Sequence, residues 1–239
     1  YMISLSPGKG VNYTGAALTG LLGAVVGSIV STRIMLAFTA KVYGREQPMI
    51  DGGTLSLGGK RVRPVRAGGT GTRFMSALLD GGMDGVKMGV SIIPGVLVIC
   101  TVVMMLTNGP AESGLYTGAA YEGIGLLPKL ADKLSFILTP LFGFSSPEGL
   151  AVPVTALGAA GAAISLVPQL LAEGKAAGGD IAVFTAMCMC WSGYLSTHVS
   201  MMNSLGCNHL IGKAIISHTV GGLCAGVAAH WLYVLFALL

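Results

Sequence analysis

Five long uncharged stretches constrain what this chain can fold into more than any other feature. A helix needs about 20 apolar residues, at about 1.5 Å rise each, to cross about 30 Å of hydrocarbon. The intervals without Asp, Glu, Lys or Arg are residues 11–32, 88–111, 149–172, 181–212 and 214–239. Each is long enough for a membrane-spanning helix, and we expect each to cross once.

The composition supports a membrane protein and excludes other classes. Of the 239 residues, 53% are hydrophobic and 10% are charged, whereas soluble domains average roughly 25% charged residues. A mean hydropathy of +0.75 excludes a disordered chain, which needs low hydrophobicity. The 37 glycines suit membrane helices that pack closely. The predicted fold class is therefore all-α: a polytopic membrane helix bundle of about five spanning helices plus a re-entrant or interfacial segment.

The re-entrant or interfacial segment is a sixth uncharged interval, residues 134–147. It holds 14 residues and contains Pro140 and Gly143, so it is too short to span and is interrupted in the middle. An equally good interpretation joins it to residues 126–133 as one buried or surface amphipathic piece. Both interpretations stay open from the sequence.

Half of the basic residues, 7 of 14, lie between Lys41 and Arg73, where Glu46 and Asp51 are the only acids. Cytoplasmic loops of membrane proteins carry such an excess of Lys and Arg. We therefore expect residues 41–73 to form a loop on the cytoplasmic side of a bacterial or archaeal inner membrane. Binding of anionic lipid is the alternative role, and a nucleic-acid partner is not expected. Three parts follow: residues 1–40 (first span), 41–87 (basic cytoplasmic loop and amphipathic lead-in) and 88–239 (helical membrane domain).

A cytoplasmic basic loop places the N-terminus outside. The chain begins with Tyr1 and shows no signal peptide. We expect that an upstream helix is missing or that this is a fragment or a processed piece; alternatively, the first segment crosses by charge bias alone.

Residues 186–206 form the most polar of the predicted spans. At about 100° per residue, hydroxyl and amide side chains fall within one arc of about 80°: Ser192, Ser196, Ser200 and Asn203. Larger side chains gather on another side: Trp191, Tyr194, His198 and Met202. Hydrocarbon offers polar groups no partner. The stripe therefore either packs against another helix or lines a solute or water path.

Ionisable residues inside the predicted spans are the other functional candidates. The four histidines are His198, His209, His218 and His230, and an intramembrane ionisable group is a functional hypothesis by default. We favour His198 and expect the other three to be hydrogen-bonded core residues.

Glu148 follows Ser146 and Pro147 at the start of a predicted span. One interpretation makes Ser146 the N-cap, Pro147 a first-turn residue and Glu148 a favourable charge near the positive end of the helix dipole. The other interpretation is a carboxylate in a substrate or ion site built from a discontinuous helix, as in transporters. The sequence leaves both open.

Metal and enzyme chemistry have little support. Cys188 and Cys190 would point about 200° apart on a helix and lack zinc-finger spacing, so His198 and Cys207 nearby do not complete a site. We expect Cys100, Cys188, Cys190 and Cys224 to be free thiols. No catalytic signature occurs, so we predict no enzyme and no cofactor.

Three stretches carry a family resemblance: GGMDGVKMGVSIIPGVLVICTVVMMLTNG (81–109), LSFILTPLFGFSSPEGLAVPVTALGAAG (134–161) and CMCWSGYLSTHVSMMNSLGCNHLIGKAIISHT (188–219). They resemble the nucleoside-recognition (Gate) domain membrane proteins, of the YjiH-like and spore-maturation A and B types. These proteins are in turn similar to the gate segments of concentrative nucleoside transporters. The resemblance covers residues 81–239 and implies broken helices and re-entrant hairpins around a substrate site.

With this resemblance, the predicted function is a transporter or transporter subunit for a small polar solute, perhaps nucleoside-like, with Na⁺ or H⁺ as a possible coupling ion. The predicted substrate-binding residues are Glu148, Trp191, Ser192, Ser196, His198, Ser200 and Asn203. Two alternatives are a non-transporting assembly subunit and an ion-translocating subunit. Beyond the solute and membrane lipid, we expect a homo-oligomer or a hetero-oligomeric membrane partner.

Overall fold

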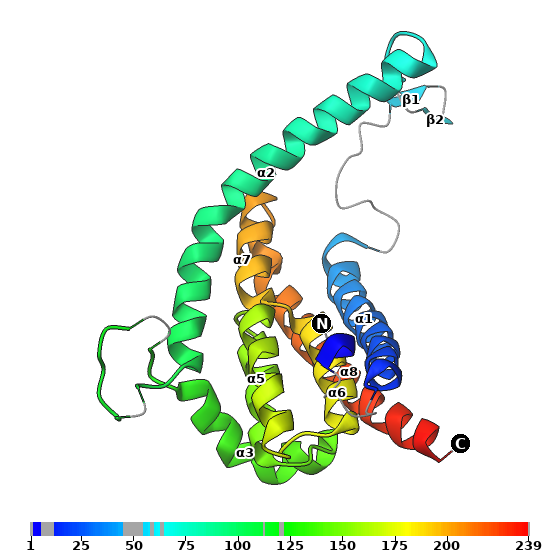
Figure 1. The fold of residues 1–239 in the computed structure, drawn as a ribbon. Helices are drawn as coiled ribbons and strands as arrows, with labels where there is room; N and C mark the ends of the chain where they lie inside the picture. Colours follow the sequence, from blue (N-terminus) through cyan, green and yellow to red (C-terminus); the bar gives the residue numbers. More distant parts are fainter. Residues whose placement is uncertain are drawn as a thin grey trace.

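The computed structural model describes residues 2–5, 12–44, 55–57, 60–62, 65–111, 113–119 and 122–238. These residues form a bundle of helices (Figure 1) with one small hairpin. In chain order the elements are η1 Met2–Leu5, α1 Thr14–Tyr43, β1 Leu55–Leu57, β2 Lys60–Val62, α2 Thr70–Thr107, α3 Leu126–Phe142, η2 Pro147–Leu150, α4 Ala151–Ala156, α5 Ala160–Ala172, α6 Gly178–Trp191, α7 Tyr194–Ser204, η3 Asn208–Leu210 and α8 Ile211–Ala237.

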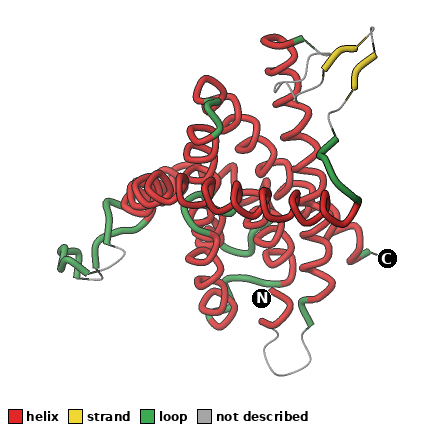
Figure 2. Tube along the Cα trace, turned by 90° about the horizontal axis from the view of Figure 1, so that it is seen from above, coloured by secondary structure: helices red, strands yellow, loops and turns green. Residues whose placement is uncertain are grey.

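The predicted helical class is confirmed apart from one detail in the basic segment. Strands β1 and β2 pair antiparallel there, with Leu57 opposite Lys60. The sequence joins these strands through two glycines, a pair typical of tight hairpin turns. We predicted only a loop across 41–73, and much of that segment lies outside the described residues. Figure 2 shows the two strands at the edge of an otherwise helical molecule.

Within the described residues, three helical stretches are long and apolar enough to cross a membrane: Thr14–Tyr43, Thr70–Leu106 and Asn208–Ala237. They cover most of the predicted spans 11–32, 88–111 and 214–239. The length and composition of these helices thus indicate a membrane protein. The other two predicted spans, 149–172 and 181–212, are each interrupted, so neither is one continuous helix.

The stretch 149–172 folds back on itself. Helix α4 has 6 residues, about 9 Å of length, and α5 begins after a turn at residues 157–159. The two ends of this hairpin meet, because the Ser146 hydroxyl donates to the carbonyl oxygen of Lys175 at 2.9 Å. The element that returns to its starting point is therefore 147–172, which we call the α4–α5 hairpin, and not 134–147.

Residues 134–147 instead belong mostly to α3, which begins at Leu126 and ends at Phe142. The second interpretation of that interval, one piece joined to 126–133, is the one that the structure has. Gly143 ends the helix with φ of 64°, a left-handed conformation that glycine adopts readily. Beyond it, the backbone N–H of Ser145 donates to Asp180 Oδ1 at 2.9 Å, which ties α3 to the first turn of α6.

Helices α1, α6 and α8 form the closely packed part of the bundle. Small residues on α1 allow the approach: a methyl group added at Gly23 would lie 2.8 Å from the Ala225 carbonyl oxygen on α8. Close backbone contact over small residues is the usual way in which membrane helices associate. Phe142, Phe144 and Phe184 fill the space at the α3 end of α6, with ring centroids 5.5 and 5.6 Å apart.

Helix α2 has the opposite character. It runs for 38 residues, about 57 Å, along one side of the bundle and extends beyond it (Figure 1). Pro94 lies inside it; a proline there removes a backbone hydrogen bond and bends a helix. Contact with the bundle comes through α7, where Ser91 donates to the Ser204 hydroxyl at 3.1 Å.

Candidate functional site

The predicted span 181–212 is broken in the middle. Helix α6 ends at Trp191 and α7 begins at Tyr194, and between them Gly193 has φ of 72°. A residue with a side chain would be strained there. A methyl group at this position would also lie 2.9 Å from the carbonyl oxygen of Gly158. We call residues 192–193 the α6–α7 break.

The turn of the α4–α5 hairpin lies directly against this break. The Gly193 N–H donates to the carbonyl oxygen of Ala156, the last residue of α4, at 2.9 Å. Two interrupted helices therefore meet, and each leaves backbone groups that its own helix does not use. In membrane proteins, irregular backbone of this kind is tolerated where it is buried in protein or lines a cavity.

Aromatic and imidazole rings gather next to the break. Tyr194 contacts Trp191 on one side, with ring centroids 6.3 Å apart, and stacks on His218 of α8 at 4.9 Å and 10°. His198 meets His218 edge to face at 4.5 Å and 86°. We call Trp191, Tyr194, His198 and His218 the ring cluster. Trp191 Nε1 is buried without a hydrogen-bond partner among the described residues.

A pocket of about 610 Å³ lies on the α2 side of the hairpin turn. Thr155 on α4, which is 7% exposed, and Asn108 at the end of α2 both line it. The Asn108 Nδ2 atom is buried and finds no partner in the described part of the chain. Gly161 and Ala162, in the first turn of α5, complete this wall. That turn has no side-chain cap, because Ala159 occupies the N-cap position.

Several hydrogen-bond donors therefore converge on this pocket. The N–H groups of a helix's first turn have no partner within the helix, and they form the positive end of its dipole. Together with the Asn108 amide they suit a solute that presents carbonyl or carboxylate oxygens. The volume is in the range of small-molecule binding sites.

The α6–α7 break separates Ser192 from the rest of the predicted serine stripe, whereas Ser196, Ser200 and Asn203 lie together on α7. Ser196 is buried and donates to the Gly193 carbonyl oxygen at 2.8 Å. Ser200 is buried against α2, where a methyl group added at Gly95 would lie 2.6 Å from its hydroxyl oxygen. Asn203 is exposed on α7. Ser192 is exposed and lines a separate apolar pocket of about 480 Å³ between α1, α5 and α6.

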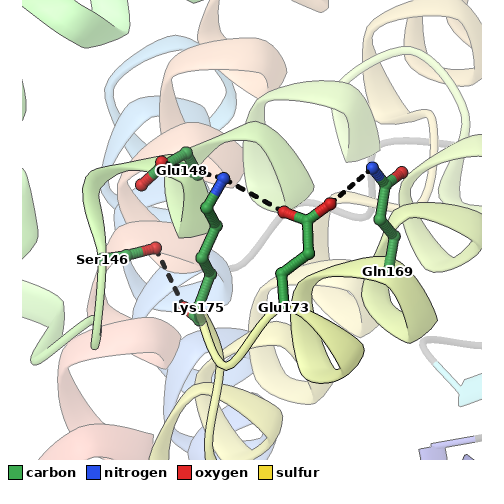
Figure 3. Close-up of polar contacts among 5 residues, drawn as sticks. All are labelled: Ser146, Glu148, Gln169, Glu173 and Lys175. Carbon is green, nitrogen blue, oxygen red and sulfur yellow. Dashed lines mark hydrogen bonds and ion pairs between the residues drawn. The ribbon is translucent and has the colours of Figure 1, made fainter.

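Glu148 lies far from the ring cluster. It is at the base of the α4–α5 hairpin, near the first turn of α6, whereas Trp191 ends the 14 residues of that helix, about 20 Å away. Figure 3 shows its surroundings: Lys175 Nζ lies 3.3 Å from Glu148 and 3.0 Å from Glu173. The amide of Gln169 donates to Glu173 at 2.8 Å. We call Glu148, Glu173 and Lys175 the charged triad.

The electrostatics of the triad are those of a surface ion-pair network. The backbone N–H of Glu148, followed by the Lys175 ammonium, lowers the pKa of the Glu148 carboxyl. The Gln169 amide, followed by Lys175, lowers the pKa of Glu173, and both carboxylates raise the pKa of Lys175. All three side chains are 40 to 49% exposed, so solvent screens these effects. Ser146 occupies the N-cap position of η2 and Pro147 lies in its first turn, but the Ser146 side chain makes no capping hydrogen bond and donates to the Lys175 carbonyl oxygen instead.

The part of the chain that the structure describes contains no group of three or more His, Cys, Asp or Glu side chains that could hold a metal ion. Cys188, Cys190, Cys207 and Cys224 are free; the Cys100 side chain lies outside the described residues. Cys190 donates to the Ala24 carbonyl oxygen on α1 at 3.7 Å.

Sequence reasoning missed Asn108, Thr155 and Asp180 and gave His218 little weight. Asp180 is 1% exposed and accepts bonds from the Ser145 hydroxyl at 2.5 Å and the Ala177 N–H at 2.8 Å. An acid three residues after a helix start is a capping signal, which could have located it. For His218 the signal was an ionisable residue within a span. Asn108 follows the last turn of a span and gave no signal.

Comparison with protein-family models, with curated proteins and with solved structures finds no match to this chain.

Proposed function

We propose that this chain is an integral membrane transporter, or a subunit of one, for a small polar solute, with nucleoside-like molecules as the first class to test. The observation that supports it is the meeting of two interrupted helices at the Gly193 N–H and the Ala156 carbonyl oxygen. Transporters build substrate sites from discontinuous helices near the middle of the bilayer.

The depth of the junction supports this assignment. The charged triad is too exposed to face hydrocarbon, so the base of the hairpin belongs at a membrane surface. Helix α5 has 13 residues, which carry the chain about 20 Å from that surface. The hairpin turn then lies near the middle of a hydrocarbon core about 30 Å thick.

The pocket of Asn108 and Thr155 is where we place the solute. Its donors favour a carbonyl-bearing or carboxylate-bearing molecule, which includes nucleobases and amino acids. The pocket adds Asn108 and Thr155 to the residues to test. The solute contacts that we predicted remain predictions for all seven residues: Glu148, Trp191, Ser192, Ser196, His198, Ser200 and Asn203.

The two ends of the bundle differ in a way that fits the proposed orientation. Tyr43, at the end of α1 and the start of the basic segment, contacts His209 just before α8. The charged triad lies at the opposite end, beside the start of α6. If residues 41–73 are cytoplasmic, the hairpin enters the membrane from outside.

The test is thermal stabilisation of the detergent-purified protein by nucleosides, nucleobases and amino acids, with and without sodium, because a ligand of the folded state raises its stability. We expect a selective shift that Thr155→Val reduces at least tenfold in apparent affinity, since valine keeps the shape and removes the hydroxyl. Thr101→Val is the matched control; its hydroxyl bonds only within α2, to Leu97. No shift with any compound, or an equal loss in both variants, contradicts the proposal.

A second function is favoured by the surface of α2. Large apolar side chains are exposed along the whole helix, Phe74, Leu79, Val86, Leu97 and Met105 among them. In a bilayer such a face contacts lipid or another helix. We infer a membrane partner or a second copy as the alternative role, and cross-linking through a cysteine placed at position 79 or 97 tests it. A cysteine at position 84, on the charged part of α2, is the control. A higher yield of cross-linked dimer from position 79 or 97 than from position 84 supports this role.

A further inference from the structure

His218 is held at the α6–α7 break by three neighbours. Its Nε2 atom hydrogen-bonds the Cys190 carbonyl oxygen, in the last turn of α6. Because a carbonyl only accepts, Nε2 carries the hydrogen, and Nδ1 is the nitrogen that can take a second proton. The stacked Tyr194 ring and the edge-to-face His198 ring occupy two further sides.

Two of these neighbours favour a positive charge on His218. The last turn of a helix carries the negative end of its dipole, which stabilises a protonated histidine. The face of an aromatic ring attracts a cation, and the Tyr194 ring is fixed parallel to the imidazole. Its hydroxyl lies 2.5 Å from Thr219 Oγ1, which in turn donates to the Ile215 carbonyl oxygen at 2.8 Å.

The third neighbour, His198, limits the charge to one. With ring centroids 4.5 Å apart, two imidazolium ions would repel each other strongly, so the pair titrates as a unit. The edge-to-face arrangement suits one protonated and one neutral ring, since the positive edge of the first meets the electron-rich face of the second.

One ring of this pair, that of His218, lines a pocket. This pocket, of about 470 Å³, lies between α1, α6 and α8 and is also lined by Cys190. Its α1 wall includes the hydroxyl side chains of Ser28, Ser31 and Thr32. Hydroxyl groups both donate and accept hydrogen bonds, so they can hold the water that delivers a proton.

The nearest charged residues along the chain are Lys213, five positions before His218 on α8, and Arg33, which follows the pocket residue Thr32 on α1. The titratable groups that face His218 are Cys190 from α6 and Tyr194 and His198 from α7; the pocket residues of α1 are uncharged. The other two histidines near or on α8 lie at different heights along the bundle: His209 is beside Tyr43 and His230 is beside Gly143. In the described part of α2, Gly95 lies at the level of Ser200, and Lys87 lies two turns further from the break.

We propose that His218 and His198 form a binding site for a single proton, carried on His218 and reached through the pocket beside α1. Resting on the proposed function, this site couples solute movement to the proton gradient. The half-helix end that holds the proton and the hairpin turn that borders the solute pocket are adjoining parts of one junction, so occupation of one changes the other.

Solute-independent evidence comes from nuclear magnetic resonance of the ¹⁵N-histidine-labelled protein in detergent, titrated between about pH 5 and 8. His198→Gln and His218→Gln assign the signals, and His209→Gln is the control from the same helical region. We expect the pair to take up one proton in this range. Removing His198 should convert the curve of His218 into a single step, whereas His209→Gln changes neither curve.

Two results overturn the proposal. In one, both rings protonate fully and the midpoint of each is unchanged when the other histidine is replaced; in the other, neither ring protonates in this pH range. If a glutamine variant does not fold, His198→Phe, which keeps a ring in place, and His218→Asn replace it. Coupling is then measured with the best-binding compound of the panel in liposomes loaded with a pH-sensitive dye. His218→Gln should retain the thermal shift and lose at least ninety per cent of the proton movement. Absence of any solute movement counts against the proposed function alone, since the titration stands without it.

Discussion

The charged triad and the ring cluster are both polar groups attached to interrupted helices, yet they lie at different depths and behave differently. Glu148, Glu173 and Lys175 are about half exposed and satisfy one another by ion pairs. The ring cluster holds two neutral-capable imidazoles and a buried, unpartnered indole nitrogen about 20 Å away. The charges of the triad stay where water reaches them, whereas the ring cluster has groups that can be neutral, because burying a charge is costly. The buried carboxylate of Asp180, near the triad, is instead held by three hydrogen bonds.

The charged triad and the ring cluster keep their positions only while helices α1, α6 and α8 stay closely packed. Gly23→Val tests that condition and should have the largest effect. Its side chain would enter the space of the Ala225 carbonyl oxygen, and overpacking costs about 1 to 3 kcal/mol or more. We expect the amount of monodisperse, folded protein in detergent to fall, as measured by size-exclusion chromatography. Gly15→Val is the control, since nothing lies within 4 Å of that position; equal loss in both would contradict the packing.

Asp180→Asn should have the next largest effect, because it acts at the triad's end of the bundle through a buried carboxylate. The carboxylate accepts from the Ser145 N–H, the Ser145 hydroxyl and the Ala177 N–H, whereas the asparagine amide has only one oxygen that can accept. Loss of hydrogen bonds to a charged group costs about 1.5 to 3 kcal/mol each, and we expect a total near 3 kcal/mol in denaturant unfolding. Asp84→Asn, on the exposed part of α2, should be nearly neutral. A stability for Asp180→Asn equal to that of the parent refutes this role.

Gly193→Ala tests the cluster's end of the bundle. Alanine in the left-handed region costs about 1 to 2 kcal/mol, and the added methyl group approaches the Gly158 carbonyl oxygen. We expect the melting temperature to fall and solute binding to weaken together. In contrast, Gly212→Ala places its methyl group in open space and serves as the control. Unchanged melting and binding in Gly193→Ala would mean that the junction is not constrained.

Glu148→Gln should have the smallest effect, a lowering of the melting temperature that is resolved at low salt, because exposed ion pairs contribute little and salt screens them. The folded-state pKa of Glu148 is lowered below its ordinary value of 4.5. The stability from this carboxylate is therefore present above about pH 4.5 and is lost as the pH falls through the lower, folded-state pKa. The difference in melting temperature between parent and variant should vanish at acid pH and in high salt. If the difference in melting temperature grew as the pH fell, the pH dependence would have the opposite sign and the ion pair would be refuted.

Much of the architecture could be predicted from periodicity and charge, and the exceptions have physical causes. The spans at α1, the lower part of α2 and α8 follow from uncharged length. The interruptions at residues 157–159 and 192–193 could not be predicted in this way. An apolar stretch that contains glycine has the same sequence pattern whether its helix continues or turns back. Gly193 is one of many glycines, and only the contact with Ala156 distinguishes it. For the same reason the helical spacing could not show that Ser192 is separated from Ser196, Ser200 and Asn203, which stay together on α7.

The site was predictable to a lesser extent. Trp191, Tyr194 and His198 were placed on one face, and their rings do lie together. Their partner His218 comes from another helix, whose rotation about its axis no single-chain pattern specifies. Glu148 was favoured because an acid beside apolar sequence stands out, but the residue that meets it, Lys175, lies 27 positions later. That separation became contact only because the α4–α5 hairpin closes on itself.

The junction between the hairpin turn and the α6–α7 break is joined by main-chain atoms, the Gly193 N–H and the Ala156 carbonyl oxygen. A link of this kind does not depend on which side chains the neighbouring positions carry. The pocket wall formed by Thr155 and the first turn of α5 can thus be exchanged by mutation while the scaffold that presents it persists. If this pocket takes the proposed solute, substitutions at position 155 should change which molecule binds more readily than they unfold the protein.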